Sequence, residues 1–206
     1  MEDKIKFTGF TKANNPQLGL ALVFDISGFT NFFNKPDLQY YITDYINHIV
    51  ECIEINIWGG EAYWIPEPSK KISPLPIKPK MRKFLGDGML YVWENDEKDT
   101  ISNDDFKIKL LNRLWNLQLY FGNINNRLFE IIPIGDLPLT VKFGIAKGTI
   151  YKLTEKDGTH DFIGPCINLA SRLVKYCKEI NFIASARLDI SSNKITENGY
   201  FRIIAK

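Results

Sequence analysis

Residues 18–30, LGLALVFDISGFT, contain the pattern from which the fold of this chain can be predicted. The apolar run from Leu18 to Phe24 has the length and composition of a buried strand. It ends on Asp25, although charged residues are disfavoured in strands. Four residues that can open a helix then follow, namely Ser27, Gly28, Phe29 and Thr30. A carboxylate at the end of a buried strand needs a partner, which another part of the chain must supply.

The composition predicts one globular domain over residues 1–206. With 45% hydrophobic and 24% charged residues, a chain of this length can bury one sizeable core. Its formal net charge of +2 creates no strong field for nucleic acid or anionic lipid, so we expect neither as a partner. The N-terminal residues lack an apolar signal core and no stretch has the length of a membrane span, which predicts a cytoplasmic protein.

The cysteines and histidines argue against several kinds of chemistry. The three cysteines include no Cys-x-x-Cys motif, so neither a disulfide framework nor a thiolate zinc site is indicated. The two histidines leave little material for a zinc hydrolase or a Ser-His-Asp triad.

The predicted elements alternate between strands and helices. An amphipathic helix over residues 37–58 is followed by a proline-rich excursion over 61–79 and by a hairpin that turns at Gly86-Asp87-Gly88. The remaining elements are a helix over 104–128, a strand pair LTVKFGI and GTIYKL, a helix from Pro165 to Tyr176, and closing strands NFIAS and YFRII. This order predicts an α+β fold of the ferredoxin-like kind, with helices packed on a mainly antiparallel sheet.

Asp87, at the tip of the hairpin, is the predicted partner of Asp25. Two carboxylates a few Å apart repel each other unless a proton or a cation lies between them. Oxygen ligands with open coordination positions suit Mg²⁺ or Mn²⁺ carrying a phosphorylated substrate. The backbone N–H groups of residues 27–30 can receive the phosphates. Taken singly, an Asp-Gly turn or an N-capping aspartate explains each residue without any metal.

A third stretch, DFIGPCINLASRL over residues 161–173, adds weight to the metal interpretation. Asn168 and Arg172 are four residues apart and therefore share one face of a helix. The pair could be only a solvated surface. Beside a metal-bound triphosphate it would supply donors aimed at charge that builds up on the α-phosphate.

Four ordered motifs resemble those of the class III nucleotide cyclase domain. They are FDISGFT at 24–30, KFLGD at 83–87, GIAKG at 144–148, and the set Asp161, Gly164, Asn168, Ala170 and Arg172. The resemblance implies that Asp25 and Asp87, with the Ile26 carbonyl, bind two Mn²⁺ or Mg²⁺ ions. The ribose 3′-oxygen would then attack the α-phosphorus to give a 3′,5′-cyclic mononucleotide, with Asn168 orienting the ribose and Arg172 stabilising the transition state.

The resemblance also implies a homodimer with shared sites. One subunit would supply the metal aspartates, and the other would supply Lys83, Asp161, Asn168 and Arg172. The positions usually occupied by further phosphate-binding cations are poorly matched. Lys156, Lys206 and Arg82 remain the candidates for that role.

The resemblance leaves the base open between two classes. Lys83 and Asp161 match the positions that read adenine in adenylate cyclases. Phe84 and Phe162 flank them and could narrow the pocket toward a single ring. At a finer level the chain is similar to the stand-alone cyclases of bacterial Pycsar anti-phage systems, which make cyclic UMP or cyclic CMP that activates a separate effector protein. UTP is therefore expected ahead of CTP, with ATP as the alternative.

Two other classes of protein remain possible. A non-catalytic cyclase-like regulatory domain would usually lack a metal aspartate or the Asn/Arg pair, and this chain keeps all four. A sheet-based RNA-binding module would share the order of elements, but it would need a basic face with exposed aromatic residues.

Overall fold

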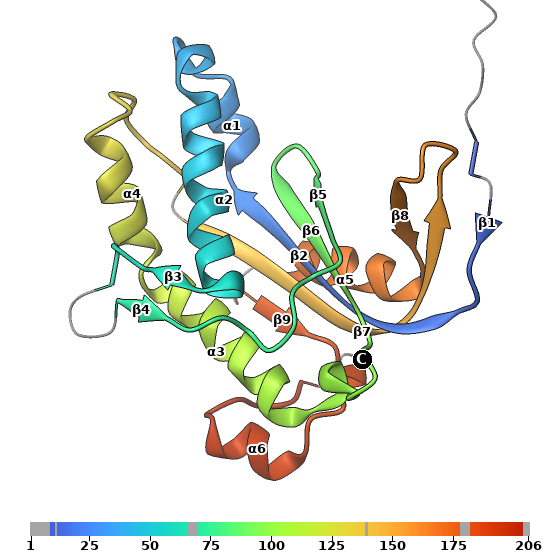
Figure 1. Cartoon of the computed structure of the whole chain (residues 1–206). Coiled ribbons are helices and arrows are strands. Elements are labelled where there is room, and N and C mark those ends of the chain that lie inside the picture. Colours follow the sequence, from blue (N-terminus) through green and yellow to red (C-terminus); the bar gives the residue numbers. More distant parts are fainter. Residues whose placement is uncertain (1–8, 11, 66–69, 139, 178–181, 204–206) are drawn as a thin grey trace, which may run out of the picture.

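The computed structural model describes residues 9–10, 12–65, 70–138, 140–177 and 182–203. Strand β2 (Gln17–Ser27) lies at the centre of its main sheet (Figure 1). It pairs antiparallel with β6 (Gly88–Glu94) on one side and with β7 (Thr140–Thr154) on the other. The remaining strands are β5 (Met81–Phe84), paired with β6, and β1 (Lys12–Ala13), β8 (His160–Ile163) and β9 (Phe182–Ala184), paired with β7. Only β9 runs parallel to its neighbour within the described part of this sheet.

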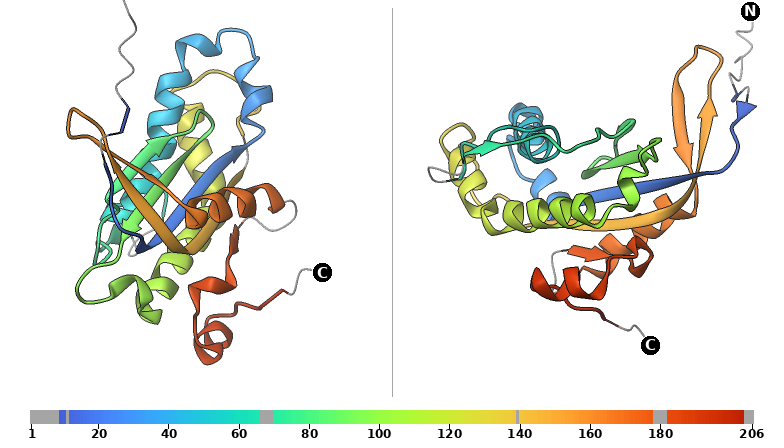
Figure 2. Two further views of the ribbon diagram at one scale, coloured as in Figure 1. Left: turned by 90° about the vertical axis from the view of Figure 1, so that its right-hand side faces the viewer. Right: turned by 60° about the horizontal axis from the view of Figure 1, so that its bottom comes forward.

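Helices cover both faces of the sheet (Figures 1 and 2). On one face lie α1 (Phe29–Phe33), α2 (Ile42–Trp58), α3 (Asp104–Leu119) and α4 (Phe121–Phe129). The opposite face carries α5 (Pro165–Tyr176). Smaller elements are the 3₁₀ turns Leu38–Tyr40, Thr100–Ser102 and Ala186–Leu188, helix α6 (Ser192–Glu197), and a ribbon of β3 (Gly60–Glu61) and β4 (Lys71–Ile72).

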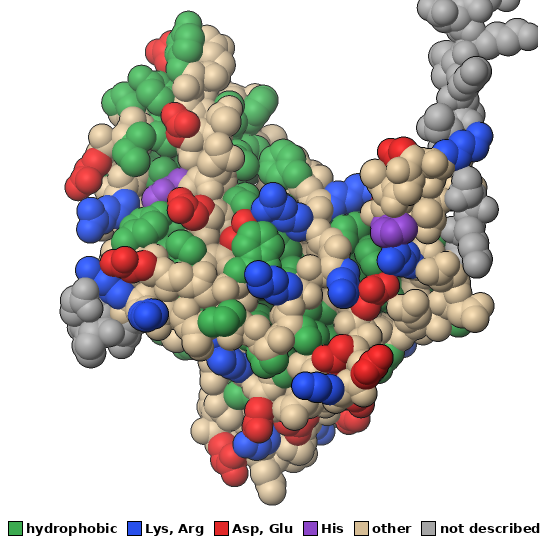
Figure 3. All heavy atoms as spheres, in the orientation of Figure 1, with side chains coloured by type: hydrophobic (Ala, Val, Ile, Leu, Met, Phe, Trp, Pro, Cys, Tyr) green, Lys and Arg blue, Asp and Glu red, His purple; other side chains and the backbone are tan. Residues whose placement is uncertain are grey.

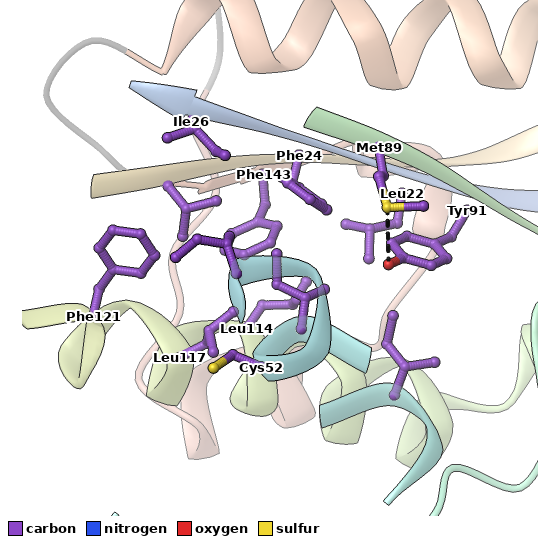
Figure 4. Packing of buried hydrophobic residues seen from close by; sticks show 14 of the residues in the cluster. Leu22, Phe24, Ile26, Cys52, Met89, Tyr91, Leu114, Leu117, Phe121 and Phe143 are labelled. Carbon is purple, nitrogen blue, oxygen red and sulfur yellow. Dashed lines mark hydrogen bonds between the residues drawn. The ribbon is translucent and has the colours of Figure 1, made fainter. Parts of the chain in front are cut away.

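Alternation along β2 divides the interior into two cores. Leu22, Phe24 and Ile26 point into the larger core, where they meet residues of α2, α3 and α4 such as Leu114 and Phe121 (Figure 4). Ala21 and Val23 point to the other face and pack beneath α5. Because successive strand residues alternate between faces, Asp25 belongs to the α5 face. The Asp25 side chain therefore lies outside the larger core.

Glycine allows α5 to approach the sheet closely. A methyl group on Gly144 of β7 would collide with the Ala170 carbonyl oxygen of α5 and with Val174. Any larger residue at position 144 would therefore push the helix away from the strand.

The structure confirms the predicted α+β fold with a mainly antiparallel sheet. It also confirms the hairpin around Asp87, and α5 has the predicted bounds. The predicted pair LTVKFGI and GTIYKL is instead one long strand, β7. Position 148 stays extended because the ladder with β2 continues through it, with Gly148 opposite Gly19.

Three further boundaries differ from the prediction. The helix expected from residue 37 begins at Ile42, because Asp37 has a left-handed backbone (φ 63°) and a 3₁₀ turn follows it. The helix expected over 104–128 is divided at Tyr120 into α3 and α4. Residues 200–203 of the predicted closing strand YFRII form no strand.

None of the helices in the described part of the chain is both long and apolar enough to cross a bilayer.

Candidate active site

Asp25 and Asp87 meet where β2 passes the β5–β6 hairpin. The ladder places Asp25 opposite Gly88, and the amide of Ile26 donates to the Asp87 carbonyl at 2.9 Å. The two carboxyl groups are close enough to share a hydrogen bond. Burial and the charge of Asp87 raise the pKa of Asp25 to about 6, against an opposing effect of Lys142. The predicted contact between these two aspartates is therefore present in a single chain.

The donor atoms at this place fit a hard divalent cation. The N–H and C=O of a strand residue point to the same side of an antiparallel ladder, so the Ile26 carbonyl also faces the hairpin tip. Two carboxylates and a carbonyl are oxygen ligands of the kind that Mg²⁺ and Mn²⁺ prefer. The described residues contain no group of three or more His, Cys, Asp or Glu side chains placed to hold a metal ion. Further ligands would have to come from water or from substrate phosphates.

Residues 27–30 form the turn between β2 and α1. Gly28 has φ 81°, a conformation that favours glycine and that ends the strand. The Ser27 hydroxyl is buried and has no hydrogen-bond partner among the described residues, whereas Thr30 is exposed. The Phe29 side chain is buried in the larger core against Tyr45. Only the backbone of Phe29 is therefore available to a phosphate.

Lys83 and Asp161 form an ion pair within one chain. The Lys83 ammonium lies 2.5 Å from Oδ2 of Asp161, joining β5 to β8. The second oxygen of Asp161 accepts a hydrogen bond from the amide of Phe162 at 2.8 Å. Strand β6 lies between the strands that carry Lys83 and Asp25, and strand spacing puts the backbones of these two residues roughly 12 Å apart.

The two phenylalanines expected to narrow the base pocket lie elsewhere. Phe162 is 5% exposed and packs in the smaller core beneath α5. Phe84 is 52% exposed, and it lies opposite Met89 on the α2 side of the sheet, whereas Lys83 lies on the α5 side. The structure therefore gives no support to a pocket closed by these rings.

Helix α5 presents Asn168 and Arg172 to solvent. Its buried side consists of Cys166, Ala170 and Val174, which explains why both polar residues project outward. Neither polar side chain has a hydrogen bond or an ion pair with the described part of the chain. Both are thus free to contact a ligand or a second subunit.

The sequence matches no protein-family model and no curated protein. Solved structures do share the fold. The guanylyl cyclase Cya2 matches with a TM-score of 0.57 and 17% identity over 91% of this chain and 81% of that chain. A double mutant of the guanylyl cyclase domain of the RhoGC fusion protein from the aquatic fungus Blastocladiella emersonii, described as monomeric, matches with a TM-score of 0.50 and 14% identity over 91% of this chain and 88% of that one.

This chain has the class III nucleotide cyclase fold. The identities are low, so the likeness concerns the arrangement of the elements and not the activity.

Within this cyclase fold, Lys142 is a candidate site residue that the sequence analysis missed. It lies directly opposite Asp25 in the β2–β7 ladder, and its charge acts on the Asp25 carboxyl. In the sequence it stands between Val141 and Phe143, which are both buried in the larger core. A lysine between two buried strand residues indicates that it faces the other side of the sheet, and that pattern could have identified it.

The other three candidates for phosphate binding differ in where they lie. Lys156 is exposed in the turn between β7 and β8. Lys206 lies outside the described residues. Arg82 lies opposite Tyr91, a residue of the larger core, and pairs with Glu54 of α2, so it points away from the α5 face.

Proposed function

We propose that this chain is a nucleotide cyclase catalytic domain that converts a nucleoside triphosphate into a 3′,5′-cyclic mononucleotide and pyrophosphate. The contact between Asp25 and Asp87 at the end of a buried strand carries the proposal. An arrangement that forces two carboxyl groups together is costly unless a cation occupies the place between them. In the cyclase fold, that place lies beside a turn able to receive phosphates.

The residues of the chain have distinct roles in this reaction. Asp25, Asp87 and the Ile26 carbonyl would hold two Mn²⁺ or Mg²⁺ ions, which would lower the pKa of the ribose 3′-hydroxyl and neutralise the triphosphate. Lys142, opposite Asp25, would add a positive charge beside the same phosphates. The 3′-oxygen attacks the α-phosphorus, its proton leaves to solvent, and the bond to the pyrophosphate oxygen breaks.

Asn168 and Arg172 would act on the reacting part of the nucleotide. Both project from α5 without an internal partner, so neither has to give up a contact in order to bind substrate. The Asn168 amide would orient the ribose, and the Arg172 guanidinium would stabilise the charge that develops on the α-phosphate.

A symmetric homodimer is part of the proposal. Exposed apolar side chains border the site elements: Leu85 next to the hairpin tip, Ile163 beside Asp161, and Tyr176 at the end of α5. Exposed apolar side chains on the elements of a polar site are suited to burial by another subunit. A second copy laid across this face would bury them and would bring its own α5 to the aspartates.

The proposal leaves the base of the substrate nucleotide to be assigned, and two alternatives for it have support. Similarity to the Pycsar cyclases supports UTP first and CTP second, with cyclic UMP or cyclic CMP activating a separate effector protein in the cytoplasm of a bacterium under phage attack. The Lys83–Asp161 ion pair supports ATP, because it places a donor and an acceptor side by side. The positions of Phe84 and Phe162 remove one of the reasons for preferring a pyrimidine.

One experiment tests both the activity and the base. The purified chain is incubated with Mn²⁺ and with each of ATP, GTP, CTP and UTP separately, and the products are identified by chromatography and mass. Cyclic UMP or cyclic CMP as the main product would support the pyrimidine assignment, and cyclic AMP would replace it with an adenylate cyclase. No cyclic product from any of the four, with metal binding intact, would favour the non-catalytic regulatory domain.

A further inference from the structure

The strand that carries Lys83 lies at the edge of the described sheet. Strand β5 has four residues and pairs, among the described strands, with β6 alone. Just outside the strand, the amide of Lys80 donates to the Val92 carbonyl at 2.7 Å and the amide of Leu85 donates to the Gly88 carbonyl at 2.9 Å. A short edge strand held on one side only can shift unless its side chains fix it.

Arg82 makes the contact on the side of β5 that faces α2. Its Nη1 lies 2.5 Å from Oε1 of Glu54, and its guanidinium carbon lies 5.5 Å from the centre of the Trp58 ring. The Glu54 side chain is only 14% exposed, so the carboxylate is held in place by its surroundings. A guanidinium that both pairs with a carboxylate and stacks on an indole is constrained in distance and in orientation.

The partners of Arg82 belong to a rigid part of the molecule. Glu54 and Trp58 lie on α2, which is anchored in the larger core by Ile49, Ile53 and Ile57. Through Arg82 the edge strand is therefore tied to the core of the domain. The neighbouring residue, Lys83, projects to the opposite face and meets Asp161. A shift or rotation of β5 would move both side chains together.

We propose that Arg82 is a positioning residue for the base-recognition pair. It does not contact the nucleotide. By tying β5 to Glu54 and Trp58 it holds Lys83 where its ammonium meets Asp161, so that the pair presents one fixed donor–acceptor arrangement to the base. This inference rests on the proposed cyclase function and adds a specificity determinant that lies outside the site.

Two properties separate this role from a general contribution to stability. Exposed ion pairs contribute little to the global stability of a domain, and the Arg82 side chain is 56% exposed, so its loss should leave the protein folded. A positioning role predicts a loss in nucleotide recognition and in the choice of base. It predicts no comparable loss in the chemical step, because Asp87 is hydrogen-bonded to β2 through the amide of Ile26.

The test uses four variants of the full chain. Arg82→Met removes the guanidinium, Arg82→Lys keeps the charge but not the planar group, and Glu54→Gln removes the partner's charge. Lys80→Met is the matched control, because it removes an exposed positive charge two residues away that has no ion pair among the described residues. For each variant, kcat and KM are measured with the best and second-best nucleotides, and hydrogen exchange is measured at the amides of residues 81–84.

We expect Arg82→Met to raise KM for the best nucleotide roughly 5- to 10-fold while kcat changes less than about twofold, the size of effect typical of one ion pair with a cation–π contact. The preference for the best base should fall, and the β5 amides should exchange faster. Glu54→Gln should behave similarly, Arg82→Lys should lie between Arg82→Met and wild type, and Lys80→Met should match wild type.

Unchanged KM and base preference in a folded Arg82→Met protein would overturn the proposal, and so would an equal effect of Lys80→Met. If the wild-type chain cyclises none of the four nucleotides, the proposed function fails. In that case the hydrogen-exchange rates of the β5 amides still show whether Arg82 orders this strand. Unaltered exchange in Arg82→Met would overturn the proposed ordering of β5, whatever the activity of the protein.

Discussion

Asp25 lies between Asp87 of the hairpin tip and Lys142 of β7, and these neighbours act on its proton in opposite directions. Burial has the largest effect and opposes the charged form of Asp25, and the charge of Asp87 adds to that effect. Lys142 favours the carboxylate. At the scale of single residues, the metal-free site is therefore a place where negative charge is costly.

The first prediction concerns stability against pH in the absence of metal. The folded pKa of Asp25, about 6, lies above its ordinary value of 3.8, so the folded protein binds this proton more tightly than the unfolded chain. The resulting stabilisation is complete below about pH 4 and is lost as the pH rises to about 6. At pH 8, Asp25→Asn should therefore be more stable than wild type by about 1–2 kcal/mol after allowance for solvent screening.

Chemical denaturation at pH 4 and at pH 8, both with chelator, measures this difference. At pH 4 the two proteins should be nearly equal, because Asp25 is then protonated. Added Mn²⁺ at pH 8 should stabilise wild type and leave Asp25→Asn almost unchanged. A difference of the same size at both pH values would show that the carboxylate is not the cause.

A second residue-scale prediction concerns Lys142. Replacing it with Met removes a positive charge opposite Asp25, so triphosphate binding should weaken and KM should rise by about tenfold. The pKa of Asp25 should rise further, since the effect that lowers it is gone. Steady-state kinetics against pH, with Lys147→Met on the same strand as the control, check both expectations. Equal kinetics for the two variants would remove Lys142 from the site.

Among the elements, α5 and β7 form the contact on which the site depends most. The helix carries Asn168 and Arg172, and Gly144 lets it lie directly against the strand that carries Lys142. The close approach at this one glycine therefore sets how α5, and with it Asn168 and Arg172, lies on the sheet of its own subunit.

Gly144→Ala tests that contact. The added methyl group meets the Ala170 carbonyl oxygen and Val174, so we expect a loss of about 2–4 kcal/mol in the free energy of unfolding. Activity should fall further than stability alone explains, because α5 moves relative to β7.

Gly122→Ala is the matched control. Gly122 lies in helix α4 with open space around its Cα, and alanine there should stabilise the protein by up to about 1 kcal/mol. Equilibrium unfolding of both variants measures the two changes in the free energy of unfolding. A neutral Gly144→Ala would mean that α5 can shift freely.

At the scale of the whole molecule, the distribution of side chains over the surface bears on the kind of partner that the protein can bind. Figure 3 shows one face of the chain, on which basic, acidic and apolar groups are interspersed, in keeping with the small net charge. The apolar groups Leu85, Ile163 and Tyr176 lie on the elements that carry the site residues. These exposed apolar groups are suited to the proposed association of two copies, whereas the small net charge does not favour a polyanion as a partner.

Mixing two inactive variants tests the shared site. Asp87→Ala removes the metal ligand, and Arg172→Ala removes the donor on α5. If each site takes these residues from different subunits, half of the randomly mixed dimers are heterodimers with one intact site of two. Activity should then recover to about a quarter of the wild-type value.

The formation of heterodimers must be proven separately with distinguishable tags. Full heterodimer formation without any recovery would place all the catalytic groups of a site in one chain.

Local patterns were enough to predict several parts of this protein. Three of them are short-range features: a buried run that ends in Asp25, a Gly-Asp-Gly turn, and a periodic helix after Pro165. Each could be predicted without knowing which strands pair in the sheet. The meeting of Asp25 with Asp87 followed from one assumption, that the first strand lies beside the hairpin.

Tertiary structure alone decided which way the strand residues point and what they meet. Phe84, Arg82 and Lys142 each lie on a face that depends on register and on the helix that covers it. Arg82 was a candidate for the phosphates, yet it contacts Glu54 of α2. Lys142 was overlooked, yet it lies opposite Asp25. The reason is physical: a strand residue has two possible faces, and only pairing with distant strands determines which of them is the site.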